Sequence, residues 1–287
     1  MTIATDFFDM TAAPMRIGAV RLKVRDLGAV SAFYQSVLGL RLVVSGDDRI
    51  TLGSGGTPLL ELVGDPKLAP LDPRQAGLFH TAFLMPARAD LARWVAHVVE
   101  ARVPLQGASD HIVSEALYLA DPEGNGIEVY ADRPVSDWLG ESGEIRMSTD
   151  PLDLQELLRS AGGTAWTGFP EGGSVGHVHL QVGDTAEADR FYRDLLGLDI
   201  AARYPGASFY GSGGYHHQLA GNVWNSRRAG VRPQGMAGLD AVEIVVRSAA
   251  DLAAITARVE GAGMESIKTT DGLTLHDPWG TAITLTT

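Results

Sequence analysis

Two histidines and one glutamate stand in predicted strands, and their side chains together could bind a metal ion. Glu128 lies between two apolar residues in a predicted hairpin, 116–130, whose arms flank a turn rich in Asp, Pro, Gly and Asn. A buried carboxylate without a partner is costly, so Glu128 either faces solvent or meets a positive group. His80 and His177 lie in two further predicted strands. Two neutral imidazoles and one carboxylate on one face of an ion suit non-haem Fe(II) and leave the other face open.

A repeated pattern surrounds these residues. The segments FYQSVLGL and FYRDLLGL lie 158 residues apart, each in a predicted helix that follows a predicted strand. The two helices begin after Asp26 and Asp184 and end at a glycine, as helix capping favours. Two further strand–helix units begin at Gly77 and Gly238. Similar residues in register over whole units indicate internal repeats.

The repeats predict an α+β fold built from four tandem βαβββ modules. The modules are expected at about residues 16–70, 75–132, 174–228 and 236–287. The first pair of modules would occupy residues 1–135 and the second pair residues 174–287. Between them we expect a linker, 136–173, with a short helix near 153–159.

Composition narrows the classes of function. The chain has 287 residues, no cysteine and a formal charge of −12, from 23 basic and 35 acidic residues. The missing cysteines exclude disulfides and thiolate metal sites, and the acidic balance argues against a nucleic-acid partner. No basic stretch followed by an apolar run opens the sequence, and no apolar run is long enough to span a membrane. We therefore expect a soluble, cytoplasmic protein without a membrane partner.

Four tandem βαβββ modules with these turns resemble the vicinal oxygen chelate superfamily. This superfamily includes glyoxalase I, bleomycin-resistance proteins and the type I extradiol ring-cleaving dioxygenases. The resemblance covers the chain except for roughly its first fifteen residues and the linker. It implies two clefts, each enclosed by the curved sheets of two paired modules, with a metal between paired modules.

The resemblance also implies the metal ligands. His80 and His177 occupy the first-strand metal position of modules two and three, and Glu128 occupies the hairpin carboxylate position. Modules one and four have Ala19 and Ala241 at the first-strand position. Either histidine alone would more readily be a structural residue, but their equivalent positions favour a metal site. We expect one Fe(II) per chain, with Mn(II) as the alternative.

A histidine pair in module three matches a further functional position. His217 corresponds to the acid/base histidine of two-domain bacterial catechol 2,3-dioxygenases. Neighbouring residues of a strand point to opposite faces, so we expect His216 to face away or to pack behind the site. Gln218 stands where the subgroup usually has a third histidine, a departure that bears on substrate preference.

Two residues of module two complete the candidate site. Tyr118 stands ten residues before Glu128, the spacing of the active-site tyrosine and the ligand glutamate in extradiol enzymes. His111 corresponds approximately to a histidine behind the metal ligands, with a solvent-exposed loop histidine as the alternative interpretation.

The resemblance implies an Fe(II)-dependent extradiol dioxygenase that cleaves catechol or a substituted catechol with O₂ and gives a muconic semialdehyde. His217 would take and return protons, and Tyr118 and His111 would hydrogen-bond to the substrate. Two alternatives remain open: a glyoxalase-like metal-dependent lyase or isomerase, in which a carboxylate such as Glu61 could serve, and a non-catalytic small-molecule-binding protein of the drug-resistance kind.

The ligand positions predict which modules pair. A triad requires its ligands within a few ångströms of one another, so module two must pair with module three, and module one with module four. This pairing could occur within one chain or between the two chains of a homodimer.

Overall fold

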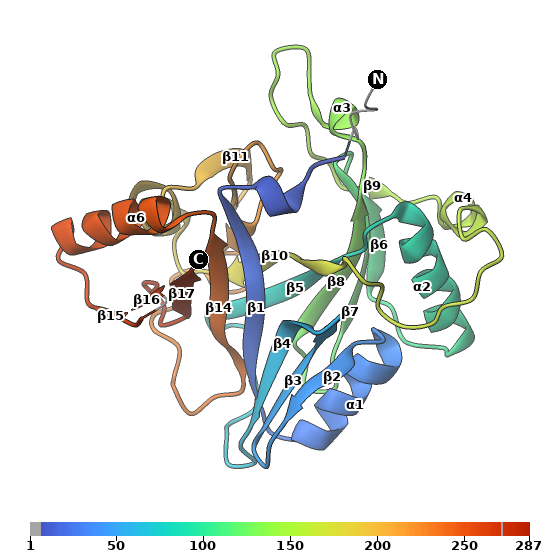
Figure 1. Cartoon of the computed structure of the whole chain (residues 1–287), viewed down its shortest axis with the longest axis horizontal. Coiled ribbons are helices and arrows are strands. Elements are labelled where there is room, and N and C mark those ends of the chain that lie inside the picture. Colours follow the sequence, from blue (N-terminus) through green and yellow to red (C-terminus); the bar gives the residue numbers. More distant parts are fainter. Residues whose placement is uncertain (1–6, 271) are drawn as a thin grey trace.

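Two large β-sheets lie in the middle of the molecule, and helices α1, α2 and α6 lie outside them (Figure 1). The computed structural model describes residues 7–270 and 272–287. The element order β-α-β-β-β occurs four times along these residues, and the predicted α+β class is confirmed. Within the described ranges, no helix is long and apolar enough to cross a membrane.

The elements of the first half follow the predicted repeats closely. After the short helix η1 (Met10–Ala12), the first run contains β1 (Met15–Val24), α1 (Leu27–Val37), β2 (Arg41–Ser45), β3 (Arg49–Ser54) and β4 (Thr57–Gly64). The second run contains β5 (Gly77–Leu84), α2 (Arg88–Glu100), β6 (Gly107–Asp110), β7 (Ser114–Ala120) and β8 (Gly126–Asp132).

The second half repeats this order after a connecting segment. That segment contains α3 (Val135–Trp138), β9 (Asp150–Pro151) and α4 (Leu154–Arg159). The third run contains β10 (Ser174–Gln181), α5 (Thr185–Asp189), η2 (Arg190–Leu195), β11 (Asp199–Tyr204), β12 (Ala207–Gly211) and β13 (Leu219–Asn222). The fourth run contains β14 (Gly238–Val246), α6 (Ala249–Gly261), β15 (Ser266–Lys268), β16 (Gly272–His276) and β17 (Ala282–Thr286).

The predicted capping residues begin the repeated helices. The Asp26 side chain accepts a hydrogen bond from the backbone N–H of Ala29 at the start of α1. Asp184 caps α5 in the same way, by accepting from the N–H of Glu187. The third-run helix differs from its counterpart because its second half, η2, is π-helical.

The two sheets pair distant parts of the chain. The first sheet has eight strands in the order β15-β16-β17-β14-β1-β4-β3-β2, and the second has nine in the order β11-β12-β13-β10-β5-β8-β7-β6-β9. The antiparallel pair β1–β14 joins the first and fourth runs, and the antiparallel pair β5–β10 joins the second and third. The predicted pairing is therefore confirmed, and it occurs within one chain.

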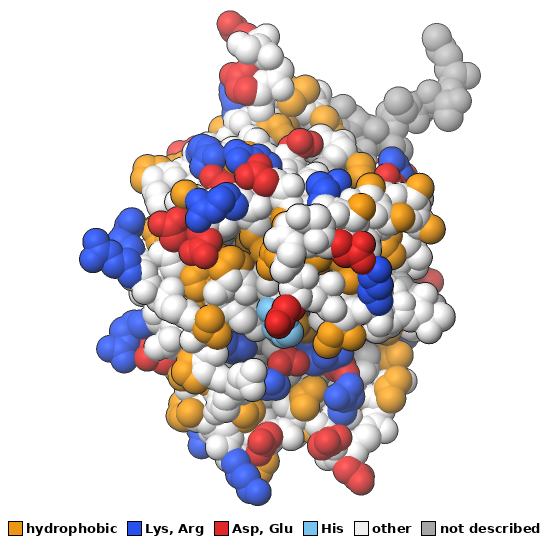
Figure 2. Space-filling model, turned by 90° about the vertical axis from the view of Figure 1, so that its left-hand side faces the viewer, with side chains coloured by type: hydrophobic (Ala, Val, Ile, Leu, Met, Phe, Trp, Pro, Cys, Tyr) orange, Lys and Arg blue, Asp and Glu red, His pale blue; other side chains and the backbone are white. Residues whose placement is uncertain are grey.

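A common apolar core connects the sheets. The central strand β1 of the first sheet contacts the central strand β10 of the second. Val20 and Leu22 on β1, and Val178 and Leu180 on β10, are almost completely buried in this core. Burial of such side chains stabilises each by about 1.5–3 kcal/mol, so the core fixes the strands that carry the candidate site. On the outer surface, acidic and basic side chains are interspersed, as one face shows in Figure 2.

Candidate active site

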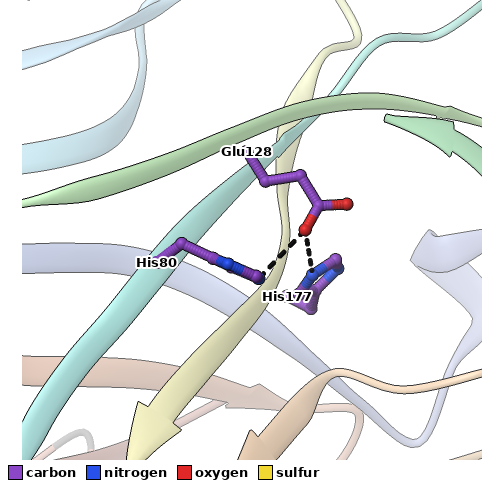
Figure 3. A group of neighbouring side chains, drawn as sticks. All are labelled: His80, Glu128 and His177. Carbon is purple, nitrogen blue, oxygen red and sulfur yellow. Dashed lines mark hydrogen bonds and ion pairs between the residues drawn. The ribbon is translucent and has the colours of Figure 1, made fainter. Parts of the chain in front are cut away.

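His80, Glu128 and His177 converge on one point of the second sheet (Figure 3). Glu128 Oε2 lies 2.9 Å from His80 Nε2 and 3.2 Å from His177 Nε2. One potential ligand atom from each residue lies within 4.8 Å of the others, and all three side chains are buried. Among the described residues, this is the one cluster of its kind. The structure thus brings together the three residues that the sequence predicts as ligands.

Irregularities in the pairing of β5 with β10 position these side chains. His179 pairs with His80 and His177 pairs with Ala82, but Gly176 is an extra residue on β10 without a partner. A Cβ at Gly176 would lie 1.8 Å from Tyr130 Oη, so glycine is required for this close approach. Such bulges bend a strand and redirect side chains, here the side chain of His177 directly after the glycine.

The chemistry of the three side chains fits a divalent metal. Burial lowers the pKa of His177 to about 4, so its imidazole is neutral near pH 7 and has a lone pair for a metal. Burial acts to raise the pKa of Glu128, but the adjacent His177 and His80 outweigh burial and hold the pKa well below its usual value. His80 Nε2 lies 2.9 Å from Glu128 Oε2 but forms no hydrogen bond of acceptable geometry, and His177 Nδ1 is buried without a hydrogen-bond partner. A neutral imidazole, a carboxylate and a buried imidazole nitrogen that forms no hydrogen bond are the donors that an ion would satisfy.

The position of His216 and His217 corrects the prediction of a strand. Both residues lie in the loop 212–218 between β12 and β13, so strand alternation does not separate their side chains. His216 packs behind His217, the second of the two expected placements, with their Nδ1 atoms 2.9 Å apart. Both side chains are buried, and the rings of His217 and His177 are 4.2 Å apart. Burial lowers the pKa of His217 well below its ordinary value.

Asp132 determines how the histidine pair shares its protons. This residue was missed by the sequence analysis, although it lies four residues after Glu128 on the same face of β8. Its Oδ1 lies 3.0 Å from His216 Nε2 and accepts a hydrogen bond from it. In the His216 tautomer that carries its proton on Nε2, Nδ1 is an acceptor, and His217 Nδ1 then donates to it. This arrangement leaves His217 Nε2 unprotonated, as a general base requires.

Tyr118 and His111 form a second hydrogen-bonded chain. His111 Nδ1 lies 2.6 Å from the backbone oxygen of Ser148, which can only accept, so this nitrogen donates. His111 Nε2 is then the acceptor for the Tyr118 hydroxyl, 2.5 Å away. The Tyr118 oxygen keeps its lone pairs for another donor. Its pKa is raised well above the usual value by burial and by the charge of Glu128 on the paired strand. His111 is half-buried and lines the cavity, so the exposed-loop interpretation is wrong.

A cavity of about 650 Å³ opens over this site. The three candidate ligands, His217, Tyr118 and His111 all line it. Several other residues of its wall were missed by the sequence analysis, chiefly Phe79, Phe209 and Trp224. Gln218 is absent from the wall, because its side chain accepts a hydrogen bond from the backbone N–H of Ser212 instead.

The corresponding region of the first sheet has different chemistry. Glu61 forms ion pairs with Arg21 and Arg49, so its carboxylate is already partnered and lies on the other sheet. Ala19 and Ala241 stand at the two first-strand positions and offer no ligand atom. Thr274 and Thr284 occupy the paired positions that correspond to Tyr118 and Glu128. Only the second sheet therefore presents the predicted ligand set.

Comparison with known proteins gives matches over most of the chain. The model of the Glyoxalase/Bleomycin resistance protein/Dioxygenase superfamily matches residues 16–129 and 174–285. A Bacillus subtilis (strain 168) protein named catechol-2,3-dioxygenase is 38% identical over 267 residues, which cover 91% of this chain and 93% of the relative. Biphenyl-2,3-diol 1,2-dioxygenase 3 of Rhodococcus globerulus is 32% identical over 130 residues, which cover 43% of this chain and 66% of the relative.

A solved structure shows the same architecture. Glyoxalase I from Zea mays superposes with a TM-score of 0.57 at 16% identity, over 96% of this chain and 92% of that chain. At this identity the likeness concerns the fold alone.

Proposed function

The chain belongs to the Glyoxalase/Bleomycin resistance protein/Dioxygenase superfamily, and from that premise we propose that it is an extradiol dioxygenase that cleaves the ring of catechols. The observation that carries this proposal is the convergence of His80, Glu128 and His177 beside His217 in the wall of one cavity. The relative at 38% identity, which is named a catechol-2,3-dioxygenase, supports the same reaction.

We propose that His80, Glu128 and His177 hold Fe(II), with Mn(II) as the alternative ion. The two imidazoles would coordinate through Nε2, the atoms nearest the Glu128 carboxylate. When bound, such an ion supplies a site that takes up the diol oxygens and lets electrons pass from the ring to O₂.

The protein side of the reaction is proton transfer. A catechol carries two hydroxyl protons, and the hydrogen-bond chains described above present two acceptors, His217 Nε2 and the Tyr118 oxygen. His217 would take one proton as general base, with Asp132 and His216 holding its ring in the required tautomer, and would return it as general acid. Tyr118 would accept a hydrogen bond from the second hydroxyl. Its own hydrogen bond to His111 would then transmit to His111 any change in the charge of the substrate oxygen. The site thus offers two acceptors, one for each hydroxyl group of a catechol.

The alternative functions explain fewer of these observations. A glyoxalase-like site with a fourth protein ligand would need another carboxylate, but Glu61 is paired with arginines on the first sheet. A binding protein that needs no metal would leave unexplained why the buried His80 Nε2 lies 2.9 Å from Glu128 Oε2 without forming a hydrogen bond.

Metal content of carefully matched variants tests the proposed site. Protein prepared without oxygen and loaded with Fe(II) should retain about one ion per chain after desalting. Glu128→Gln should lower the affinity for the ion by at least about tenfold, because second-sphere changes alone cost that much in known sites. Glu61→Gln, at a comparable position on the other sheet, should have no effect. Equal retention by the Glu128 and Glu61 variants, or two ions per chain, would contradict the proposal.

A further inference from the structure

An aromatic wall extends from the candidate catalytic residues to the mouth of the cavity. We call the residues Phe79, His179, Phe209 and Trp224 the aromatic subsite. All four line the cavity. Trp224 is 47% exposed, so it marks the solvent side, whereas His179 is buried beside His80 with 5.0 Å between ring centroids.

The aromatic subsite is continuous with the site of reaction. The Phe209 ring lies 5.0 Å from His217 and 5.7 Å from His179, centroid to centroid. Trp224 lies 5.4 Å from both His179 and Phe79. These separations are typical of packed aromatic pairs, so another ring could pack against the same wall. A substrate bound between His217 and Tyr118 therefore has an aromatic surface directly beside it.

Local structure holds the subsite in place. Phe79 is an extra residue in β5, because Leu78 and His80 pair with consecutive residues of β10. This bulge explains how two neighbouring side chains, Phe79 and His80, both reach the cavity. The Trp224 indole N–H donates to the backbone oxygen of Pro205 at 2.9 Å, which fixes the edge of its ring. The wall is thus preformed and would lose little side-chain entropy when a ligand binds.

The charge around the cavity selects against anionic substituents. Among the described residues that line the cavity, none is Lys or Arg. The lining does include the carboxylate of Glu128, and the whole chain carries a formal charge of −12. A carboxylate on the substrate ring would therefore be desolvated without a cationic partner, which is unfavourable. The cavity volume of about 650 Å³ also exceeds the needs of a single ring and lies in the range of drug-sized ligands.

We propose that the aromatic subsite binds an uncharged aryl substituent, so that the preferred substrates are aryl-substituted catechols and not catechol carboxylates. This inference rests on the proposed ring cleavage for its kinetic consequences, but the subsite itself would bind an aryl group without the metal.

Kinetic comparison of substituted catechols tests the substrate class. With the Fe(II)-loaded protein, kcat/KM should be at least about tenfold higher for the better of 3-phenylcatechol and 4-phenylcatechol than for catechol. For 2,3- and 3,4-dihydroxybenzoate it should be at least about a hundredfold lower than for the phenyl compounds. Equal or higher kcat/KM for either carboxylate would overturn the proposal.

Two substitutions in the cavity wall and one control substitution outside it locate the effect. Trp224→Ala should remove most of the advantage of the phenylcatechols, by lowering kcat/KM for these compounds by a much larger factor than kcat/KM for catechol. Trp166→Ala is the matched control, because Trp166 stacks on His97 away from the cavity. It should change neither the ratio of kcat/KM between the phenylcatechols and catechol nor the ratio between the phenylcatechols and the dihydroxybenzoates. Asn225→Arg places a cation at the exposed part of the cavity wall and should raise kcat/KM for a dihydroxybenzoate at least about tenfold. An unchanged preference in Trp224→Ala would contradict the assignment.

Ligand binding without metal separates this inference from the proposed reaction. Calorimetric titration of the metal-free protein with 2-phenylphenol, which has one hydroxyl, should show saturable binding that Trp224→Ala weakens at least about fivefold. If this binding occurs but no catechol is cleaved, the proposed function fails and the subsite stands. If catechol is cleaved but 2-phenylphenol binding is absent or insensitive to Trp224, the subsite fails.

Discussion

Asp132, His216 and His217 illustrate how single residues decide what a buried histidine can do. The carboxylate orients His216, and His216 in turn fixes which nitrogen of His217 carries the proton. His216 does not itself line the cavity but contacts His217, which lines it beside the candidate metal ligands. We therefore propose that His216 positions His217 and that His217 acts on the substrate.

Substitution of the two histidines should separate these roles. His217→Phe should leave metal binding intact and lower kcat by about two to four orders of magnitude, the usual effect of a lost general base. His216→Phe should lower kcat less and should shift the tautomer of His217, which nitrogen-15 NMR of the metal-free protein can report. Loss of the metal from His217→Phe would show that this residue is a ligand. An unchanged His217 tautomer in His216→Phe would contradict the positioning role.

The buried histidines also predict how stability depends on pH. Burial lowers the pKa of His177 to about 4, and it lowers the pKa values of His179 and His217 as well. The unfolded chain therefore binds more protons than the folded chain once the pH falls below about 6.5, so the free energy of unfolding should decrease between pH 7 and pH 5. Urea unfolding of the metal-free protein should show this slope, and His217→Phe should reduce it. Equal slopes in the unsubstituted protein and in His217→Phe would contradict this prediction.

Sequence predicts the triad because His80 and His177 stand at equivalent positions of similar units, and because the family resemblance assigns the hairpin carboxylate position to Glu128. His80, Glu128 and His177 are found in this way, and the structure brings them together. Asp132 and Phe79 are not predicted from the sequence, because neither belongs to a motif. Asp132 acts through His216, and Phe79 reaches the cavity through a bulge. The sequence analysis wrongly places His216 and His217 in a strand. The strand begins after them, at Leu219 and Ala220. Strand boundaries depend on pairing partners that the local sequence does not specify.

At the scale of elements, the bulged pair β5–β10 sets the geometry of the site. The extra residues Gly176 and Phe79 lie on opposite strands near the two candidate histidine ligands. Helix ends and the turn between β7 and β8 are predictable from Asp, Pro and Gly residues, because their conformational preferences are local. A bulge depends on the register of two distant strands, and the sequence of either strand leaves that register open.

Gly176→Ala tests the importance of the bulge. The new Cβ would overlap Tyr130 Oη, and relief of this overlap would displace β10 next to His177. We expect a loss of about 1–3 kcal/mol in the free energy of unfolding, together with weaker metal binding. Gly230→Ala is the control, because a Cβ there meets nothing within 4 Å. Equal stability and metal affinity in the two variants would show that the bulge has no such role.

At the scale of the whole molecule, each sheet is shared between the two halves of the chain. The second sheet takes His80 and Glu128 from the first half and His177 from the second. The requirement that the ligands meet predicts this pairing from the sequence. The choice between pairing within one chain and pairing between two chains needs the structure, because both satisfy the same contacts.

Coexpression of two inactive variants checks that the site is formed within one chain. His80→Ala and His177→Ala each remove one candidate ligand from a different half. In the structure described, no combination of these two chains contains an intact triad, so a mixture should remain inactive. A site shared between chains would restore activity through mixed dimers. The coexpressed mixture should therefore have no more activity than the sum of the single variants, and recovery of activity would contradict the fold.

Oxygen-dependent ring cleavage tests the central claim most directly. Fe(II)-loaded protein should be mixed with catechol and ¹⁸O₂ while an electrode follows oxygen and mass spectrometry identifies the product after reduction of its aldehyde. The account predicts consumption of one O₂ per catechol and a ring-opened product cleaved beside, not between, the two hydroxyl carbons, and it predicts that Glu128→Gln abolishes both. Fully loaded protein that consumes no oxygen with catechol or its phenyl derivatives, or that cleaves between the hydroxyl carbons, would contradict it.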